Sequence, residues 1–417
     1  WSFRSFNQRM HNKVMLFDDA VLITGGRNIE NTYFDHSTAM NFRDRDVLAV
    51  GPVVRGAVES FEHFWSYRHA VSSRDLADVG AVIAKGGYRR YATRADYDFG
   101  PHFAGLDREA NDAALIGARF ASKLKPVRRV EFISDEPGKS AGGATMARIT
   151  QALRSTLEQA KSSIVMQTPY LVLSRPARKL IREMQEINPA LRIRISTNSF
   201  ASTDNLFAYS ANYRLRNDYI EDLKLQVYEF KPLPASLPVL FSRQPLMARI
   251  ATAQAEAGKT ARPPFLCVHA KTLVVDGRIA FIGSYNLDPR SENLNTEVGL
   301  LIEDEALARE LQAEMEADMQ PANSWVIARR KLPLRLDVVN GFIDDVLSLS
   351  PIDLWPIQNT SSFELRPGAV DVPPGHPAFY ENHRDVGPFP GTEGFLSTKE
   401  IMTRLYKAVG SPLTPVL

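Results

Sequence analysis

Two stretches of this 417-residue sequence share one pattern: a histidine, a lysine two positions later and an aspartate five positions after the lysine. The two sets are His11, Lys13 and Asp18, and His269, Lys271 and Asp276. The same ungapped alignment pairs Asn28 with Asn286. A histidine and a lysine two apart on a strand point to one face of the sheet. Two such faces turned toward each other would surround one centre with imidazoles, ammonium groups and amides, which suits a phosphodiester.

Such a centre could cleave a phosphodiester in two steps. One histidine would attack phosphorus and form a phosphohistidine, while the other would protonate the leaving alcohol and then deprotonate the incoming one. The groups that would stabilise charge on the phosphoryl oxygens are Lys13, Lys271, Asn28, Asn286 and Ser284. The spacing does not distinguish the two histidines.

Two other interpretations of the repeat stand beside this one. Histidine often binds metals, but a cation is disfavoured beside the lysine that accompanies each histidine. The sequence also has a single cysteine and no CxxC or HExxH spacing. We therefore expect no metal and no other cofactor. The second alternative is structural: two core histidines, each with a lysine whose stem is buried and whose ammonium reaches solvent.

Each motif is expected to lie on a β-hairpin. Residues 14–17 and 272–275 are mostly apolar, as in buried strands. Asp18 and Asp276 follow at turns, and a return strand follows each turn. In this interpretation the two aspartates fix the turns rather than touch phosphate.

An acidic residue opens the strand after each hairpin, Asp46 in the first half and Glu297 in the second. A strand and then a helix follow in both halves, so we pair these two acids. We expect each carboxylate to hold the Nδ1 of a motif histidine, which would set the tautomer and orient the ring. For Asp46, an ordinary turn residue is the alternative.

The duplicated pattern resembles the phospholipase D superfamily, which is named for two such HKD motifs. Residues 283–291 and 295–297 are similar to bacterial cardiolipin synthases, and residues 25–28 are similar to their C-type branch. The resemblance runs from about residue 8 to about residue 330. It implies an α/β fold: a pseudo-twofold pair of mixed sheets flanked by helices.

The resemblance also implies a function. All six motif residues would be catalytic, with His11 as nucleophile and His269 as acid and base. The enzyme would move a phosphatidyl group between phospholipids and make cardiolipin, with phosphatidylglycerol or phosphatidylethanolamine as acceptor. It would sit peripherally on the bacterial inner membrane. The alternatives are a phospholipase D that uses water, a nuclease, and a non-catalytic lipid-binding module; nuclease relatives tend to carry one motif per chain and dimerise.

We divide the chain into a first half at 1–66, a connector at 67–127, a second half at 128–330 and a Pro-rich tail at 331–417. Strand-like and helix-like stretches alternate between residues 163 and 230, which favours a mostly parallel sheet there. Residues 233–264 are expected to form an insertion or mobile loop near the site.

The first half is expected to be incomplete. About 100 residues of alternating strand and helix precede His269, against ten residues before His11. We interpret this as an N-terminal truncation. Strand 14–17 would then have an unpaired edge, and apolar exposure would be worst beside residues 14–24.

Composition restricts the partners. The formal net charge is +2, which gives no reason to expect nucleic-acid binding. No apolar run reaches the roughly 18 residues of a transmembrane helix, so we expect any membrane contact of this sequence to be peripheral. Residues 344–355 could touch a membrane surface or pack on the core, and the cluster at 88–91 could contact phosphate or form a solvated loop. Ten of the 26 prolines follow residue 350, so residues 358–390 are expected to be extended or poorly ordered.

Overall fold

The structure is a computed structural model that describes residues 7–86, 105–142, 147–255, 263–331, 359–392 and 401. The chain forms two compact units, one from residues 1–60 together with 129–417 and the other from residues 61–128. Both histidine motifs belong to the larger unit. The described helices of the smaller unit are α3 (Ala77–Ala84), α4 (Leu106–Ala110) and α5 (Ala113–Arg119).

The first motif lies at the start of a short antiparallel sheet, as predicted. Strand β1 (Val14–Phe17) pairs with β2 (Val21–Gly25), and β2 pairs with β4 (Asp46–Val50). Asp18 and Asp19 make the tight turn with positive φ angles of 51° and 54°, a conformation that aspartate tolerates better than most residues. Helix α2 (Val53–Trp65) follows β4 and buries Val54 and Ala57.

Strand β1 is the edge of this three-stranded sheet in the described residues. Its side chains Met15 and Phe17 are each 46% exposed. These apolar side chains are exposed as predicted, but Ile29 and Trp65 are 87% and 73% exposed, so the prediction that exposure is worst beside residues 14–24 is wrong. The equivalent strand of the second half, β10 (Thr272–Val275), is paired on both sides, and its Leu273 and Val275 are buried.

The second half is built on a ten-stranded mixed sheet of described residues, with the order β15-β14-β13-β8-β7-β6-β10-β11-β12-β5. The hairpin of β10 and β11 (Ile279–Gly283) lies inside it. The remaining strands are β5 (Arg129–Ser134), β6 (Ser163–Gln167), β7 (Arg192–Asn198), β8 (Gln226–Phe230), β12 (Val298–Glu303), β13 (Ser324–Arg329), β14 (Thr360–Leu365) and β15 (His383–Asp385). Strands β6, β7 and β8 are parallel, which confirms the prediction for residues 163–230, and the other pairs of this sheet are antiparallel.

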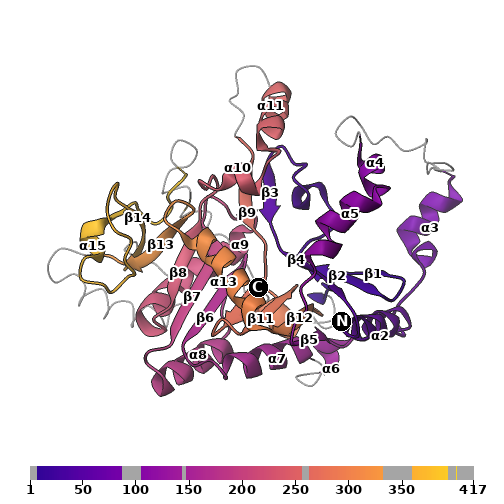
Figure 1. Cartoon of the computed structure of the whole chain (residues 1–417), viewed down its shortest axis with the longest axis horizontal. Helices are drawn as coiled ribbons and strands as arrows, with labels where there is room; N and C mark the ends of the chain where they lie inside the picture. Colours follow the sequence, from indigo (N-terminus) through magenta and orange to yellow (C-terminus); the bar gives the residue numbers. More distant parts are fainter. Residues whose placement is uncertain are drawn as a thin grey trace. The chain divides into compact units, whose positions relative to one another are not determined.

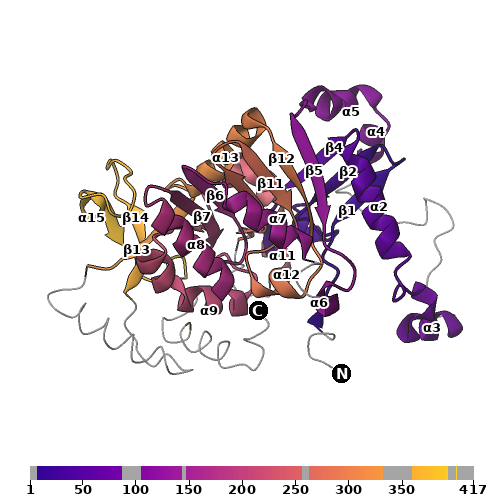
Figure 2. The ribbon, with the colours of Figure 1, turned by 90° about the horizontal axis from the view of Figure 1, so that it is seen from below.

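Helices cover both faces of this sheet (Figure 1 and Figure 2). Helices α7 (Arg148–Leu157) and α8 (Arg175–Ile187) lie on one face and pack Leu153 and Leu180 into the main core. Helix α13 (Glu305–Met319) crosses the opposite face, where Asp318 accepts a hydrogen bond from Gln167. Alternation along the strands explains the division, because neighbouring side chains point to opposite faces.

Shorter elements complete the larger unit. They are η1 (Asn31–Tyr33), α6 (Lys139–Gly142), α9 (Leu206–Arg214), the π-turn Asp218–Asp222, α12 (Pro289–Asn293), and a two-stranded parallel sheet of β3 (Met40–Arg43) and β9 (Phe265–Val268). Within residues 233–255 the chain forms α10 (Leu237–Leu240) and α11 (Gln244–Gln254). The mobile-loop alternative is therefore wrong for this stretch, and the insertion alternative stays a prediction. Proline within the first turn of each helix explains this, because its fixed φ suits a helix start.

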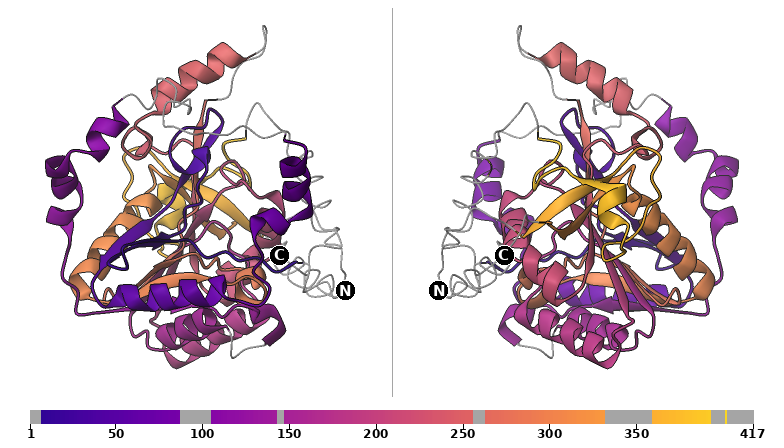
Figure 3. Two further views of the ribbon diagram at one scale, coloured as in Figure 1. Left: turned by 90° about the vertical axis from the view of Figure 1, so that its right-hand side faces the viewer. Right: turned by 90° about the vertical axis from the view of Figure 1, so that its left-hand side faces the viewer.

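The described tail must also be corrected. Residues 359–392 are not a poorly ordered extension, because β14 (Thr360–Leu365) and β15 (His383–Asp385) extend the large sheet and α15 (Phe379–Asn382) packs beside them (Figure 1 and Figure 3). Phe363 and Phe379 form a small core with Val326 there. The prolines lie between these elements rather than in them. The predictions for residues 88–91 and 344–355 fall outside the described residues.

No helix in the described part of the chain combines the length and apolar character needed to cross a membrane.

Candidate active site

Each motif lies beside a segment from the other half of the chain. Met10 forms a parallel bridge with Thr296, and the backbone N–H of His11 donates to the Thr296 carbonyl at 3.0 Å. Val268 pairs in parallel with Arg43, and the N–H of His269 donates to the Arg43 carbonyl at 2.8 Å. The two contacts are equivalent, so the repeat is organised with a crossed, pseudo-twofold arrangement.

The crossing brings a carboxylate to each imidazole. Nδ1 of His11 lies 2.8 Å from Oε2 of Glu297, and Nδ1 of His269 lies 2.7 Å from Oδ2 of Asp44. Both carboxylates are completely buried. A carboxylate beside Nδ1 selects the tautomer with its proton on that nitrogen, which leaves Nε2 of each ring for chemistry.

The sequence pairing of Asp46 with Glu297 is therefore wrong by two residues. The strand registers place Gly25 opposite Asp46 and Gly283 opposite Gly299, so Asp44 is the counterpart of Glu297. The Asp46 carboxylate instead bonds Arg27 at 2.8 Å. Asp44 and Asp46 lie two residues apart. Because the two halves differ in the spacing between the hairpin and the next strand, the sequence alone did not show which of them corresponds to Glu297. Counting back from the residue opposite the hairpin glycine would have identified it.

The two carboxylates differ in length, and the residue beside each carboxylate differs in size to compensate. Ser284 Oγ donates to Glu297 at 2.5 Å, and Ser291 Oγ donates to the same carboxylate at 2.7 Å. Gly26 stands at the position of Ser284, and a Cβ there would overlap the carboxylate of Asp44. Aspartate is one methylene shorter than glutamate, so its carboxylate occupies the room that the serine side chain takes in the other half. Ser284, predicted to bind phosphate, is thus engaged by Glu297.

Both lysines stand at the same electrostatic centre. Lys13 Nζ donates to the His11 carbonyl at 2.8 Å, and Lys271 Nζ lies 2.7 Å and 3.0 Å from the ring nitrogens of His269. Burial, and then the charge of Lys271, lowers the pKa of Lys13 to about 7. Burial lowers the pKa of Lys271 to about 8, although the nearby carboxylates of Asp44 and Glu297 raise it. Each lysine is thus influenced by carboxylates from both halves, as expected if the two motifs form one site.

The charge states of the acids and of His269 follow from the same contacts. Burial opposes ionisation of Asp44, but Lys271 and the hydrogen bond from His269 outweigh it and hold the pKa of Asp44 well below its usual range. The pKa of Glu297 is also lowered despite burial, chiefly by His11. Burial and the charge of Lys271 lower the pKa of His269 to about 4, against the opposing effect of Asp44. In the ligand-free site His269 is therefore neutral near pH 7.

The two asparagines are not used alike. Asn28 donates through Nδ2 to the hydroxyl of Tyr33 at 2.9 Å. Asn286 is buried, and its side-chain oxygen has no hydrogen-bond partner among the described residues. That oxygen is a hydrogen-bond acceptor, so a contact of the Asn286 amide N–H with phosphate stays a prediction, whereas Asn28 donates to Tyr33.

The motif aspartates lie at the hairpin turns. Asp276 accepts hydrogen bonds from the backbone N–H groups of Lys161, Ser162 and Ser163 at 2.8–2.9 Å. Asp18 is exposed and takes the same left-handed turn conformation, with φ angles of 51° for Asp18 and 52° for Asp276. These contacts fit the turn-fixing interpretation for Asp276. The catalytic role that the resemblance implies for the two aspartates stays a prediction.

Sequence reasoning missed two aromatic residues beside His269. The Tyr33 hydroxyl lies 3.4 Å from Nε2 of His269, and the Phe42 ring centroid lies 4.8 Å from the imidazole centroid. Both come from the segment between the first hairpin and Asp44. No spacing rule marks them, because their positions depend on the path of β3 beside β9.

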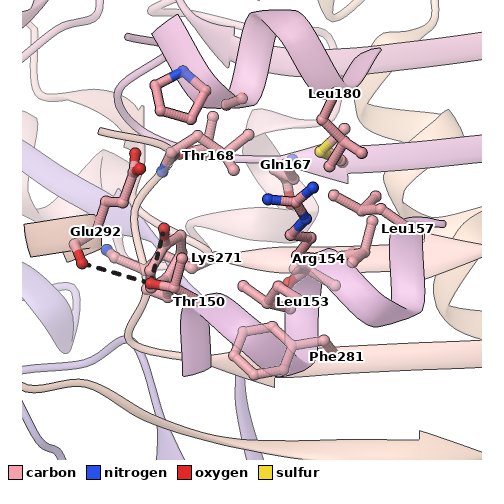
Figure 4. Close-up of a pocket in the computed structure, with 17 residues that line it drawn as sticks. Thr150, Leu153, Arg154, Leu157, Gln167, Thr168, Leu180, Lys271, Phe281 and Glu292 are labelled. Carbon is pink, nitrogen blue, oxygen red and sulfur yellow. Dashed lines mark hydrogen bonds between the residues drawn. The ribbon is translucent and has the colours of Figure 1, made fainter. Parts of the chain in front are cut away.

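A cavity of about 140 Å³ lies between the large sheet and helices α7 and α8 (Figure 4). Its lining is mostly apolar and includes Leu153, Leu157, Leu180 and Phe281. Lys271 contributes to the wall while its ammonium reaches His269. Lys271 thus lies between this apolar cavity and the charged groups around His269.

Comparison with known proteins agrees with this geometry. A family model described as "Cardiolipin synthase, PLD-like domain" matches residues 153–319, which include the second motif and Glu297. Over these residues the chain is similar to the phospholipase D-like domain of cardiolipin synthases.

Two curated relatives extend the similarity over most of the chain. Cardiolipin synthase C of Escherichia coli (strain K12) is 29% identical over 329 residues, which cover 76% of this chain and 64% of that protein. An uncharacterized protein of Helicobacter pylori (strain 26695) is 27% identical over 338 residues, which cover 79% and 61%. This phospholipase D-like chain therefore spans about three-fifths of the length of these relatives. Among solved structures, phosphatidylserine synthase of Haemophilus influenzae Rd KW20 covers 81% of this chain and 68% of its own, at 17% identity and a TM-score of 0.46.

Proposed function

We propose that this chain carries the catalytic centre of a phosphatidyltransferase related to cardiolipin synthase C. The observation that carries the proposal is the crossed pair of imidazole–carboxylate contacts, His11 with Glu297 and His269 with Asp44. Each pair is accompanied by a motif lysine, the half-buried Lys13 and the buried Lys271. Two oriented imidazoles suit a double displacement at phosphorus. The similarity to cardiolipin synthase C supports a phospholipid as the phosphodiester.

In the first step, Nε2 of His11 attacks phosphorus while the bond to the leaving alcohol breaks. His269 gives that alcohol a proton from Nε2. The low pKa of His269 in the empty site is not an obstacle, because the bound phosphodiester anion favours the imidazolium. Lys13, Lys271 and Asn286 stabilise the charge on the phosphoryl oxygens.

In the second step, His269 takes the proton of the incoming alcohol. The new P–O bond forms as the bond from phosphorus to His11 breaks. The exposure of the two rings supports this division of labour, since the side chain of His11 is 23% exposed and that of His269 is 7% exposed. Access of a bulky phosphodiester to Nε2 is therefore easier at His11.

The substrates we propose are phospholipids, with phosphatidylglycerol or phosphatidylethanolamine as acceptor and cardiolipin as product. The chain would meet them as a peripheral protein at the bacterial inner membrane. Hydrolysis by water, as in a phospholipase D, is the alternative with the same first step. A nuclease is a further alternative, and it would accept a nucleic-acid phosphodiester in the same centre.

The test is to trap the intermediate. His269→Asn should form a phosphatidyl adduct on His11 from labelled phosphatidylglycerol and release it slowly, and mass spectrometry should place the adduct on the peptide that contains His11. His11→Asn is the matched control and should give no adduct. Wild-type reactions with labelled phosphatidylglycerol, glycerol and a competing oligonucleotide then separate transfer, hydrolysis and nuclease activity. An adduct on His269, or no adduct with either variant, would refute the proposed roles.

A further inference from the structure

Tyr33 stands where it can act directly on His269. Its hydroxyl lies 3.4 Å from Nε2, the nitrogen that the proposed mechanism uses. Asn28 donates to the same hydroxyl oxygen at 2.9 Å. Since His269 donates its Nδ1 proton to Asp44, Nε2 is an acceptor. The hydroxyl proton of Tyr33 therefore points to the imidazole rather than to the asparagine. Nζ of Lys271 also lies 3.0 Å from Nε2, so the two donors share this nitrogen.

Packing fixes the orientation of this hydroxyl. The rings of Tyr33 and His269 meet edge to face, with centroids 5.1 Å apart and planes at 84°. Phe42 packs against both rings, with its centroid 4.4 Å from that of Tyr33 and 4.8 Å from that of His269. Tyr33 is 5% exposed, so solvent does not compete for its hydroxyl. A phenylalanine at this position would keep these ring contacts and lose only the hydrogen bonds.

The internal repeat supports a functional role for this position. Tyr33 stands 22 residues after His11, and Ser291 stands 22 residues after His269. Ser291 donates to Glu297, which holds His11. One position in each half thus braces the histidine of the opposite half, through the carboxylate for His11 and directly for His269.

We propose that Tyr33 is a positioning residue that holds His269 as an oriented acceptor for the proton of the incoming alcohol. This inference rests on the proposed function. In the second step the alcohol oxygen replaces the Tyr33 hydroxyl at Nε2, and the alcohol proton moves to that nitrogen. The new P–O bond forms as the bond from phosphorus to His11 breaks. Loss of the hydroxyl should therefore slow the second step more than the first.

The charged groups that act on His269 are Asp44, Lys271 and Asp204. The two acids favour the imidazolium, while Lys271 and burial favour the neutral ring. A donated hydrogen bond from Tyr33 also favours the neutral ring. Its removal should raise the pKa of His269 by about half to one pH unit, the range that one ordinary hydrogen bond supports.

The variant to make is Tyr33→Phe, with Tyr380→Phe as the matched control. Tyr380 donates its hydroxyl to the Arg329 carbonyl at 2.9 Å in the small core beside β14, away from the histidines. The pKa of His269 is measured by ¹⁵N NMR of the ligand-free protein, with His269→Asn used to assign its signal. We expect a higher pKa in Tyr33→Phe and no change in Tyr380→Phe.

The second readout is the level of the phosphohistidine during turnover. In Tyr33→Phe we expect kcat to fall about tenfold, as for one ordinary hydrogen bond, and the steady-state level of the adduct on His11 to rise. Equal adduct levels together with an unchanged His269 titration would overturn the role of Tyr33. If wild type forms no adduct, the proposed function fails, while the NMR titration still reports whether Tyr33 acts on His269.

Discussion

Asp44→Asn gives the sharpest test of the crossed site. The introduced asparagine would keep the size of the side chain and one hydrogen bond to Nδ1 of His269, which now lies 2.7 Å from Oδ2 of Asp44. It would remove the negative charge that stabilises imidazolium. A hydrogen bond to a charged group contributes about 1.5–3 kcal/mol and a neutral one about 1 kcal/mol, so the loss is about 0.5–2 kcal/mol. That difference corresponds to a fall of about two- to thirtyfold in kcat.

The comparison variant is Asp46→Asn, at the position that the sequence first indicated. Asp46 pairs with Arg27 through partly exposed side chains, so we expect less than a threefold change, as for other surface ion pairs. Turnover is measured as transfer of labelled phosphatidylglycerol at saturating acceptor. Urea unfolding of both variants controls for folding, because Asp44 is a buried charge beside Lys271. An equal loss in the two folded variants, or none in Asp44→Asn, would refute the crossed pairing.

Four further outcomes follow from the site. Lys13→Arg should move the alkaline fall of kcat/KM to higher pH. The Lys13 pKa of about 7 means that its charge is lost on mild alkalinisation, whereas arginine stays charged. A pH profile of kcat/KM that does not change on the alkaline side would show that Lys13 does not set that fall. Asp276→Asn should lower the free energy of unfolding by about 1–2 kcal/mol, because the carboxylate accepts three backbone N–H bonds, and it should change kcat by less than about twofold. Urea titration measures the first effect and the transfer assay the second. A large loss of kcat in folded protein would show that Asp276 takes part in catalysis. Exhaustive chelation should leave transfer unchanged, because a lysine accompanies each histidine; loss restored by a divalent ion would contradict this. A crystal structure with a phosphate analogue should place the rings of His11 and His269 roughly 5–7 Å apart, within reach of one phosphate; about twice that separation would exclude a single site.

Much of the site could be predicted because it lies in local sequence. The hairpins around Asp18 and Asp276, and the strand and helix after each, follow from short apolar runs and turn residues. Glu297 was found because it opens a strand whose neighbours repeat a recognisable order, and its contact with a motif histidine is confirmed. These features depend on residues within a few positions of one another.

The features that were missed depend on pairing between distant segments. Asp44 rather than Asp46 reaches an imidazole because β3 runs parallel to β9, a register that no local pattern specifies. Tyr33 meets His269 for the same reason. The described tail was misjudged because proline frequency describes the linkers, while the pairing of β14 with β13 depends on a strand edge more than 30 residues earlier in the sequence.

The second half pairs Ser284 with Glu297, whereas the first half pairs Gly26 with Asp44. This difference has a consequence for how such a site can evolve. In a symmetric pair of identical chains, one substitution would alter both imidazole environments at once. Here the two half-sites are encoded separately, so one can acquire a shorter acid and a glycine while the other keeps its serine. The two positions within each half are coupled in return, because a serine at position 26 is compatible only with a rearranged Asp44. Variation at these positions should therefore occur in pairs, and single exchanges should be less tolerated than the double exchange.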